Sequence, residues 1–323
     1  MPGVASQIIR VDQPLTRFSI ERRPIGTFIA NTLFPVFPVD KQSDLYYSDD
    51  FRLFDYGKDD EDLRGETAPT SEMSSWSSTT EPYRVRTRAK MAVTPVQAQE
   101  DLLEIYDLRK IEVERALTYL DLRREVRVKN LTLTPSAYGA GNKITCDGTT
   151  IPYMDAANGN PLQILQDAKA KCIASGVMPN TMIIPFPVWS KLIWLPKLLA
   201  PLYGVQLGML NEEILGKFFN VKVLVPTTQV NYGERNRAAS IEYIWDTHIW
   251  VGYVNPTPGK RVRQFGVTFS LKIDGAAGKA PRVRSDFDPN AGFGAWRDRC
   301  EWAIDEVRAD VTCGCIIENA LTP

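Results

Sequence analysis

The segment LFPVFPVDKQSDLYY, residues 33–47, places Pro35 and Pro38 inside an apolar run. Each proline removes an amide donor and fixes its own φ, so a helix cannot run through the segment. A central sheet strand is also unfavourable, because a proline interrupts the hydrogen-bond ladder. We therefore expect an extended segment whose apolar residues do not easily join the core of their own chain.

The residues on both sides of this segment extend the pattern. Residues 1–39 carry scattered apolar side chains and prolines at positions 14, 24, 35 and 38, with no lasting helical period. This composition predicts an extended N-terminal arm. Residues 40–72 then contain eleven acidic and four basic residues, which predicts a strongly acidic limb.

Residues 83–93, YRVRTRAKMAV, reverse the sign of the charge. Cations alternate there with Val85, Thr87, Ala89 and Met91, so a strand has one basic face and one mostly apolar face. In an isolated monomer this pattern favours a solvated edge strand whose charges discourage aggregation. A Ser/Thr-rich tip separates the two limbs, and residues 40–94 therefore form a long hairpin in this interpretation. Two strands alone bury little apolar surface, so the hairpin needs an outside surface to lie on.

A long helix is predicted after the hairpin. Thr94 and Pro95 are expected to open a short helix, and Asp107 is expected to cap a longer one that runs to about Lys129. Apolar residues recur at spacings of three and four, so one narrow stripe is buried. At about 1.5 Å per residue, the helix extends roughly 30 Å or more. The predicted stripe comprises Leu108, Ile111, Ala116, Leu117 and Leu120.

Helix and strand signals alternate from Asn160 onward, which indicates a compact α/β unit. Asn160 caps a helix that continues to about Ser175 and is closed by Gly176. Late strands at 265–271 and 309–317 are expected to return to the long helix. The other predicted helices are 188–194 and 211–219, and the other predicted strands are 181–186, 221–225, 243–245 and 250–254.

The composition disfavours several classes of function. Lys and Arg together number 38 against 39 Asp and Glu, so the net charge of −1 favours neither nucleic-acid binding nor binding to a membrane surface. The chain has no secretory signal pattern and no apolar run of ~20 residues, so we expect it to stay in the cytosol. Five widely spaced cysteines favour buried structural thiols over a disulfide framework or a metal site.

Signatures of catalysis and cofactor binding are weak. The single histidine, His248, leaves one possible base for a nucleophile, and no phosphate-loop motif is present. The carboxylate run at 59–62 lacks the spacing of a calcium loop. We predict no catalytic, cofactor-binding or metal-binding residue, no cofactor and no enzyme activity.

The order of these parts resembles the major capsid proteins of tailed phages. LFPVFPVDKQSDLYY followed by FRLFDYG resembles that family's entry into its extended loop, and LDLRREVRVKNL at 120–131 resembles the end of its spine helix. MPNTMIIPFPVWSKL at 178–192 and GKFFNVKVLVP at 216–226 look like its axial domain. The segment DTHIWVGYVNPTPGKRVRQFGVTFSL at 246–271 looks like the family's return to the peripheral domain. The segment IENA at 317–320 looks like the end of the family's fold.

The resemblance implies an α+β fold, the Hong Kong phage capsid fold. It divides the chain into an N-terminal arm (1–39), an extended two-stranded loop (40–94), a peripheral domain with the spine helix (95–155), an α/β axial domain (156–250), and return strands with the C-terminal part of the peripheral domain (251–323).

The resemblance also implies a function. Many copies, as hexamers and pentamers, would self-assemble in the host cytoplasm into the icosahedral shell of a virion that encloses double-stranded DNA. Portal and scaffolding or decoration proteins are the implied partners, the DNA contact is non-specific, and no membrane is involved. Two alternatives stay open: an encapsulin-like nanocompartment that holds a cargo enzyme, and a cytosolic α/β hydrolase.

Contacts between copies are expected at the arm and the hairpin. The acidic limb of one copy meets basic groups of the next and fixes the register, while aromatic residues of the arm anchor it on a neighbour. Cations of the spine helix are a further candidate surface toward DNA. The expected contact residues are Phe34, Phe37, Tyr46, Tyr47, Arg84, Arg86, Arg88, Lys90, Arg282 and Arg284.

Overall fold

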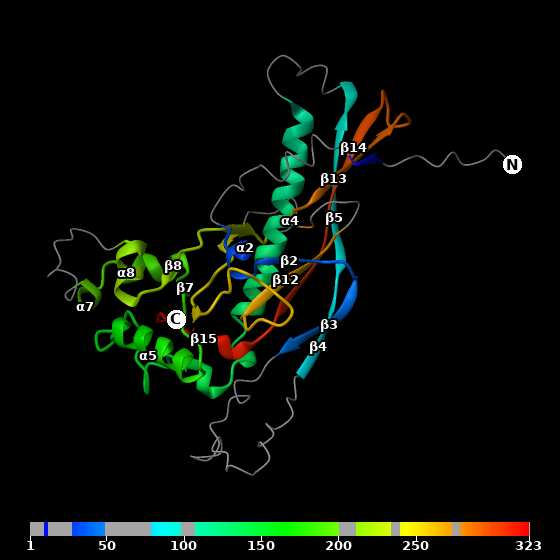
Figure 1. The fold of residues 1–323 in the computed structure, drawn as a ribbon. Helices are drawn as coiled ribbons and strands as arrows, with labels where there is room; N and C mark the ends of the chain where they lie inside the picture. The colour runs from blue at the N-terminus through cyan, green and yellow to red at the C-terminus, as the bar shows by residue number, and fades with distance from the viewer. Residues whose placement is uncertain are drawn as a thin grey trace, which may run out of the picture.

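The computed structural model describes residues 10–11, 28–48, 79–97, 107–199, 211–233, 240–272, 278 and 280–322. The fold is mixed α+β, as predicted. In Figure 1 the long helix α4 runs beside strands β5, β13 and β14 at one end of the molecule, and helices α5, α7 and α8 gather at the other. The hairpin tip, most of the predicted arm and the carboxylate run at 59–62 lie outside the described residues.

Helix α4 (Leu108–Thr132) confirms the long helix predicted from Asp107. The Asp107 side chain caps it by accepting a hydrogen bond from the Lys110 N–H at 3.2 Å. Its 25 residues extend about 37 Å at 1.5 Å per residue. Ile111 of the predicted stripe is instead 39% exposed. It lies outside the buried face of the helix, whose first residue is Val113. The buried residues are Val113, Ala116, Leu117, Leu120, Arg124, Glu125, Val128 and Thr132.

Helix α4 packs against a six-stranded sheet with the strand order β1-β13-β14-β12-β2, in which β5 also pairs with β14. Strands β13 and β14 escape sequence prediction, because the face of β14 that meets α4 carries charged residues and hides the apolar alternation. The strands are β1 (Arg10–Val11), β2 (Val36–Val39), β5 (Arg86–Pro95), β12 (Gly266–Leu271), β13 (Arg282–Asp288) and β14 (Ala295–Arg308).

The helix start predicted at Thr94 and Pro95 is wrong. Both residues belong to β5, which runs antiparallel to β14 with Pro95 opposite Ala295. Pro95 is the last residue of the strand, a position where a missing amide donor is tolerated. Helical residues begin directly afterwards, at Val96.

The proline-containing segment joins its own sheet at the edge. After the short helix α2 (Ala30–Leu33), strand β2 lies parallel to β12 at the end of the strand order, with Phe37 opposite Phe269. An edge strand tolerates proline because one of its sides needs no hydrogen-bond partner. Leu33 and Phe34 are fully buried within the chain. The expectation that this segment does not easily join its own core is therefore wrong.

Strands β3 (Ser43–Ser48) and β4 (Thr79–Arg84) pair antiparallel as a separate two-stranded sheet. The register, from Ser43 opposite Arg84 to Ser48 opposite Thr79, brings the two ends of the 49–78 segment together. Figure 1 shows this pair below the lower end of β5. The pairing lies within the stretch where the sequence predicts a two-limbed hairpin.

A second sheet, with the strand order β6-β15-β11-β7-β8, lies at the core of the α/β unit. The predicted cap at Asn160 is confirmed, because its Oδ1 accepts from the Gln163 N–H at 3.4 Å. Asn211, the first residue of the helix predicted at 211–219, serves as a cap by accepting from the Ile214 N–H at 2.8 Å. Gly176 adopts a φ of 76°, the left-handed conformation that ends a helix.

The other predicted elements of this unit are present with shifted ends, whereas β6, β9, α7 and the 3-10 helices were not predicted. Trp245 lies beyond β10, and the last strand begins at Gly314 after a short 3-10 helix. The strands are β6 (Lys143–Thr145), β7 (Thr181–Ile183), β8 (Lys222–Leu224), β9 (Gln229–Asn231), β10 (Ile241–Tyr243), β11 (Ile249–Gly252) and β15 (Gly314–Glu318). The helices are α5 (Pro161–Ala174), α6 (Phe186–Leu192), α7 (Pro196–Leu199), α8 (Glu212–Phe219), and the 3-10 helices Pro135–Ala137, Ala140–Asn142 and Val311–Cys313.

All five cysteines are buried with free thiols, which agrees with the structural role predicted for them. Burial raises the pKa of the Cys146 thiol to about 11, so this group stays protonated at neutral pH. In the described part of the chain, no helix combines the length and the apolar character needed to cross a bilayer.

Candidate functional site

Strands β4 and β5 carry four exposed cationic side chains, here called the basic row. Lys90 Nζ lies 4.7 Å from the ring centroid of Tyr119 on α4. Near the other end of the row, the Arg84 N–H donates to Asp305 Oδ2 at 2.9 Å. The four side chains face solvent in this chain, so they are available to a second molecule. The basic row comprises Arg84, Arg86, Arg88 and Lys90.

The two faces of β5 differ from the predicted alternation. Val85, just before β5, is buried, but Ala89 is exposed and Met91 is 42% exposed. Ala92 and Thr94, on the same face as the cations, are buried instead. Helix α4 covers only this far end of the cation-bearing face, where Ala92 joins its core cluster. The predicted apolar face of β5 is therefore an exposed face.

Arg282 and Arg284, on β13, are engaged within their own sheet. Arg282 Nη2 lies 2.7 Å and Arg284 Nε lies 2.9 Å from the same Glu301 Oε1. The Glu301 side chain is almost fully buried between them. The prediction that these two arginines meet the acidic limb of a neighbour loses its basis, because their own chain already supplies the carboxylate.

Two of the four predicted aromatic anchors are enclosed by their own chain. The Phe34 ring packs edge-on against Phe265 at 5.9 Å and lies so close to Gly266 that a Cβ there would meet it at 2.5 Å. The Tyr46 ring lies 5.6 Å from that of Phe269, and its hydroxyl donates to Glu81 Oε2 at 2.5 Å. Both side chains are buried, so the prediction that they anchor the arm on a neighbouring copy is wrong.

The other two predicted anchors are half-buried. Phe37 packs edge-on against Phe269 at 6.2 Å. The Tyr47 ring lies under the Arg261 guanidinium at 4.7 Å. The backbone N–H of Tyr47 donates to the Lys260 carbonyl at 3.0 Å. Their exposed parts leave them as predicted contacts, alongside the basic row.

Glu125, on the buried face of α4, holds the start of the arm segment. Its Oε1 accepts from the Ile29 N–H at 3.1 Å and from Trp245 Nε1 at 2.8 Å, and its Oε2 accepts from the Ala30 N–H at 2.9 Å. Burial raises the pKa of this carboxyl, and the three donors act against that rise. One side chain thus satisfies both amides at the start of α2.

Arg124, the adjacent residue, holds the end of the same segment. Its guanidinium donates to the Phe34 carbonyl at 3.1 Å, to Thr268 Oγ1 at 2.9 Å and to Asn31 Oδ1. It also stacks on the Trp302 ring at 4.9 Å. We call Arg124 and Glu125 together the arm clamp, because they bind both ends of residues 29–34 to α4.

Sequence reasoning misses the arm clamp, although the sequence holds a signal for it. Arg124 lies four residues after Leu120 and four before Val128, so it occupies a position of the buried stripe. A charged residue at such a position needs partners, because burying an unpaired charge is costly. Those partners are distant in the chain and cannot be identified from spacing.

Most other cations of α4 are also paired within the chain. Arg109 forms a two-pronged pair with Asp298, at 2.7 and 2.8 Å. Arg127 Nη2 lies 2.6 Å from Glu306 Oε1, and further pairs join Lys129 to Asp246 and Arg115 to Glu112. Arg123 is exposed. The helix therefore presents much less free positive charge than its sequence indicates.

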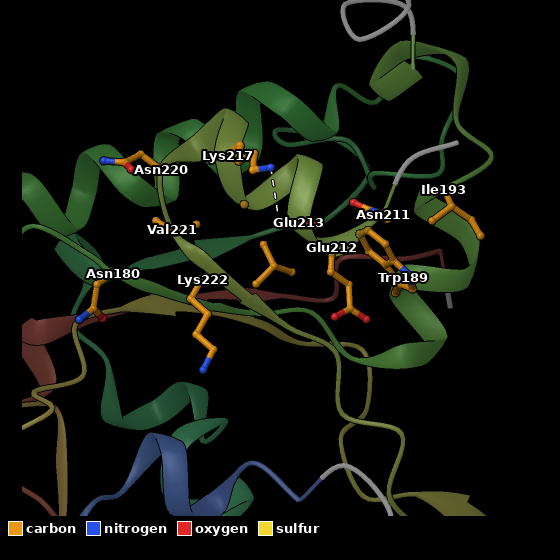
Figure 2. Close-up of a pocket in the computed structure, with 12 residues that line it drawn as sticks. Asn180, Trp189, Ile193, Asn211, Glu212, Glu213, Lys217, Asn220, Val221 and Lys222 are labelled. Carbon is orange, nitrogen blue, oxygen red and sulfur yellow. Dashed lines mark ion pairs between the residues drawn. The ribbon is translucent and has the colours of Figure 1, made fainter. Parts of the chain in front are cut away.

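A groove opens at the other end of the molecule, between α6, α8 and β8. Its volume is about 820 Å³. Figure 2 shows Trp189, Ile193 and Asn211 grouped at one end, Asn180 and Asn220 at the other, and Glu212 and Lys222 between them. We call it the edge groove, because β8 is the last strand of its sheet.

The residues considered for catalysis have structural surroundings. His248 Nδ1 accepts from the Asn319 N–H at 3.2 Å, which joins two loops of the α/β unit. Among the described residues, no three His, Cys, Asp or Glu side chains are grouped so that they could hold a metal ion.

Comparisons with known proteins point to one family. No family model matches the chain. The chain is 27% identical to the major capsid protein of Pseudomonas phage JBD67 over 316 residues, which cover 96% of this chain and 97% of that protein. It is also 26% identical to the major capsid protein of Burkholderia phage BcepMu over 161 residues, about half of each protein (50% and 51%).

Solved structures share the fold from end to end. A phage-related protein from Bordetella bronchiseptica matches with a TM-score of 0.76 and 23% identity, over 98% of this chain and 100% of that one. An encapsulin complex from Synechococcus elongatus matches less closely, with a TM-score of 0.55 and 10% identity over 93% and 89%. The α/β unit is thus one part of a larger shared fold.

Proposed function

We infer that this chain belongs to the major capsid proteins of tailed phages and that many copies of it form the shell of a virion. The alignment with a curated major capsid protein over 96% of the chain carries this conclusion. The shared fold with a phage-related protein, at a TM-score of 0.76, supports it. The work of the chain is structural: it builds a closed wall.

The fold suits a subunit of a shell because contacts within the chain hold its parts in fixed positions. The arm clamp fixes residues 29–34 on α4, and ion pairs from Arg109 and Arg127 fix α4 on β14. Surfaces that must meet other copies then keep a constant geometry, which reduces the ordering cost of each contact. We assign residues 1–39 to the arm, 40–94 to the extended loop, 95–155 and 251–323 to the peripheral domain, and 156–250 to the axial domain.

The extended loop supplies one contact between copies in this proposal. Its 49–78 segment contains nine acidic and three basic residues, so it carries a net charge of −6. The basic row of an adjacent copy offers four exposed cations to it, and Phe37 and Tyr47 flank the base of the loop. Such charge complementarity fixes register and orientation more than affinity.

The content of the shell is double-stranded DNA in this proposal. The net charge of −1 and the ion pairs along α4 leave the wall little free positive charge. Each phosphate that a protein neutralises adds a salt-dependent increment of affinity, so a nearly neutral wall holds DNA loosely. Assembly in the host cytoplasm as hexamers and pentamers, with a portal and scaffolding or decoration proteins, completes the proposal.

Electron microscopy of the expressed protein, together with sedimentation velocity, tests the shell. We expect uniform closed particles that sediment far faster than the 36.3 kDa chain. A monomer or small oligomer at high protein concentration, with no closed particles under any assembly condition, contradicts the proposal.

The encapsulin-like alternative keeps one specific observation in its favour, the fold match to an encapsulin complex. It predicts the same particles with a different content. Purified particles that contain a single co-expressed host enzyme and no nucleic acid favour the nanocompartment, whereas particles filled with phage DNA during infection favour the virion.

A further inference from the structure

The edge groove lies along the free side of β8. In the parallel pair with β7, the Lys222 N–H donates to the Asn180 carbonyl at 2.8 Å, and the Leu224 carbonyl accepts from the Ile184 N–H at 3.0 Å. Alternate residues of a parallel strand point to opposite sides, so the N–H and C=O of Val223 face away from β7. Val223 lines the groove, and among the described residues no strand pairs with this edge of β8.

Several polar side chains that line the groove are occupied within the chain. Asn180 Oδ1 accepts from the Val254 N–H at 2.9 Å, and its Nδ2 donates to the Val254 carbonyl at 2.8 Å. Asn211 Oδ1 caps α8, and Glu213 pairs with Lys217 at 3.5 Å. A small-molecule site needs convergent polar groups to orient its ligand, and these groups are already used.

The floor and one wall of the groove are apolar. Val221, Val223, Trp189 and Ile193 line it, and α8 approaches β8 so closely that a Cβ on Gly216 would lie 2.7 Å from the Val221 carbonyl oxygen. An apolar trough beside an unpaired strand edge fits an extended peptide, which supplies backbone hydrogen bonds to the edge and side chains to the trough. An exposed edge is also a liability unless something covers it.

The sequence contains a segment whose chemistry matches the groove. Residues 200–210, APLYGVQLGML, carry no charged side chain, and most of them are apolar. The described chain stops at Leu199 before this segment and resumes at Asn211, which lines the groove. The segment is thus joined directly in sequence to a residue that lines the groove.

We propose that residues 200–210 of one copy dock in the edge groove of an adjacent copy. The inference rests on the shell proposed above, in which each copy contributes one segment and receives one. The two surfaces differ, so the contact is head-to-tail, and head-to-tail contacts close into rings such as hexamers and pentamers. A single short segment binds weakly, but the ring makes every later contact intramolecular and so strengthens it.

Paired cysteine variants test this docking. The five native cysteines are buried, so introduced surface thiols react selectively with a mild added oxidant. We expect particles that mix chains carrying Ile193→Cys with chains carrying Gln206→Cys to form covalent dimers on a non-reducing gel, and the double variant to form ladders of higher multimers. Ile173→Cys, on an exposed part of α5 outside the groove, is the matched control and forms no dimer with Gln206→Cys.

Two results overturn the docking and leave the shell intact: closed particles without the disulfide, or a double variant whose disulfide joins residues of the same chain only. Ile193→Glu gives a second readout, because it sets a charge against an uncharged segment. We expect a folded protein with at least tenfold fewer closed particles than Ile173→Glu. A wild-type protein that forms no closed particles instead contradicts the proposed function itself.

Discussion

Helix α4 and the basic row on β4 and β5 are both rich in cations, yet the structure uses them in opposite ways. Arg109, Arg124 and Arg127 of α4 are bound to groups on β14, β12 and the arm segment. The basic row lies beside the same helix and remains exposed. The difference teaches that a cluster of cations is no guide to an outward surface until its carboxylate and carbonyl partners are known.

Removal of the Arg124 side chain is expected to have the largest effect. Arg124→Ala removes the buried guanidinium that donates to the Phe34 carbonyl and to Thr268 Oγ1, and it takes away one of the two cations beside Glu306, the other being Arg127. Breaking a buried charged network of this kind costs about 3–5 kcal/mol. Urea unfolding measures the loss, and the adjacent exposed Arg123→Ala is the control, expected within about 0.5 kcal/mol of wild type. Equal effects of the two substitutions would remove the contrast between the buried and the exposed cations.

Arg109→Ala is expected to cost somewhat less. It removes a two-pronged pair with the buried Asp298 and a hydrogen bond to Ser285 Oγ at 2.8 Å. Hydrogen bonds to charged groups contribute about 1.5–3 kcal/mol, and the partly exposed Arg109 places the effect in that range. The midpoint of urea unfolding checks it. Wild-type stability in Arg109→Ala contradicts the assignment of this cation to the interior.

Glu125→Gln sharpens the comparison through pH. An amide offers one oxygen where the carboxylate offers two, so a donor from α2 loses its partner, at a cost of about 1–3 kcal/mol. The pKa of Glu125 is raised in the folded state, so the carboxyl contributes most below its unfolded pKa of 4.5 and less as the pH rises through the folded value. We expect the stability gap between wild type and Glu125→Gln to narrow as the pH rises from 4. A gap that widens over that range contradicts the raised pKa.

The triple substitution Arg84→Ala, Arg86→Ala, Arg88→Ala is expected to have the smallest effect on folding and a clear effect on assembly. These exposed side chains contribute within about 0.5 kcal/mol each to the stability of the chain. Loss of their charge removes the proposed partner of the acidic 49–78 segment, so the yield of closed particles falls. Normal shells from this variant contradict the proposed contact between the basic row and the acidic segment of an adjacent copy. A large loss of folding stability would instead show that the basic row stabilises its own chain.

Local features of the fold are well predicted from the sequence. Asp107 and Asn160 cap the helices they were expected to cap, Asn211 lies at the start of the helix predicted there, and Gly176 ends its helix in the left-handed conformation. The capping bonds join residues three positions apart, which is why a sequence pattern reveals them. The order of elements also resembles one family, and full-length comparison agrees with that resemblance.

Long-range features are poorly predicted. The sequence does not indicate β13 and β14, the arm clamp or the burial of Phe34 and Tyr46. The decisive contacts join distant residues: Arg109 and Asp298 are 189 positions apart, and Ile29 and Glu125 are 96 apart. Charged residues on buried strand faces hide the alternation that identifies a strand.

The sequence by itself determined the main helices with their caps, the extended backbone around Pro35 and Pro38, and the uneven distribution of charge. These depend on interactions between near neighbours and on fixed backbone preferences. Only the tertiary structure decided which charged side chains are paired inside the chain and which remain exposed to solvent. A charge is buried only where distant residues supply its hydrogen-bond partners, and those partners meet only when the arm, α4 and β14 come together.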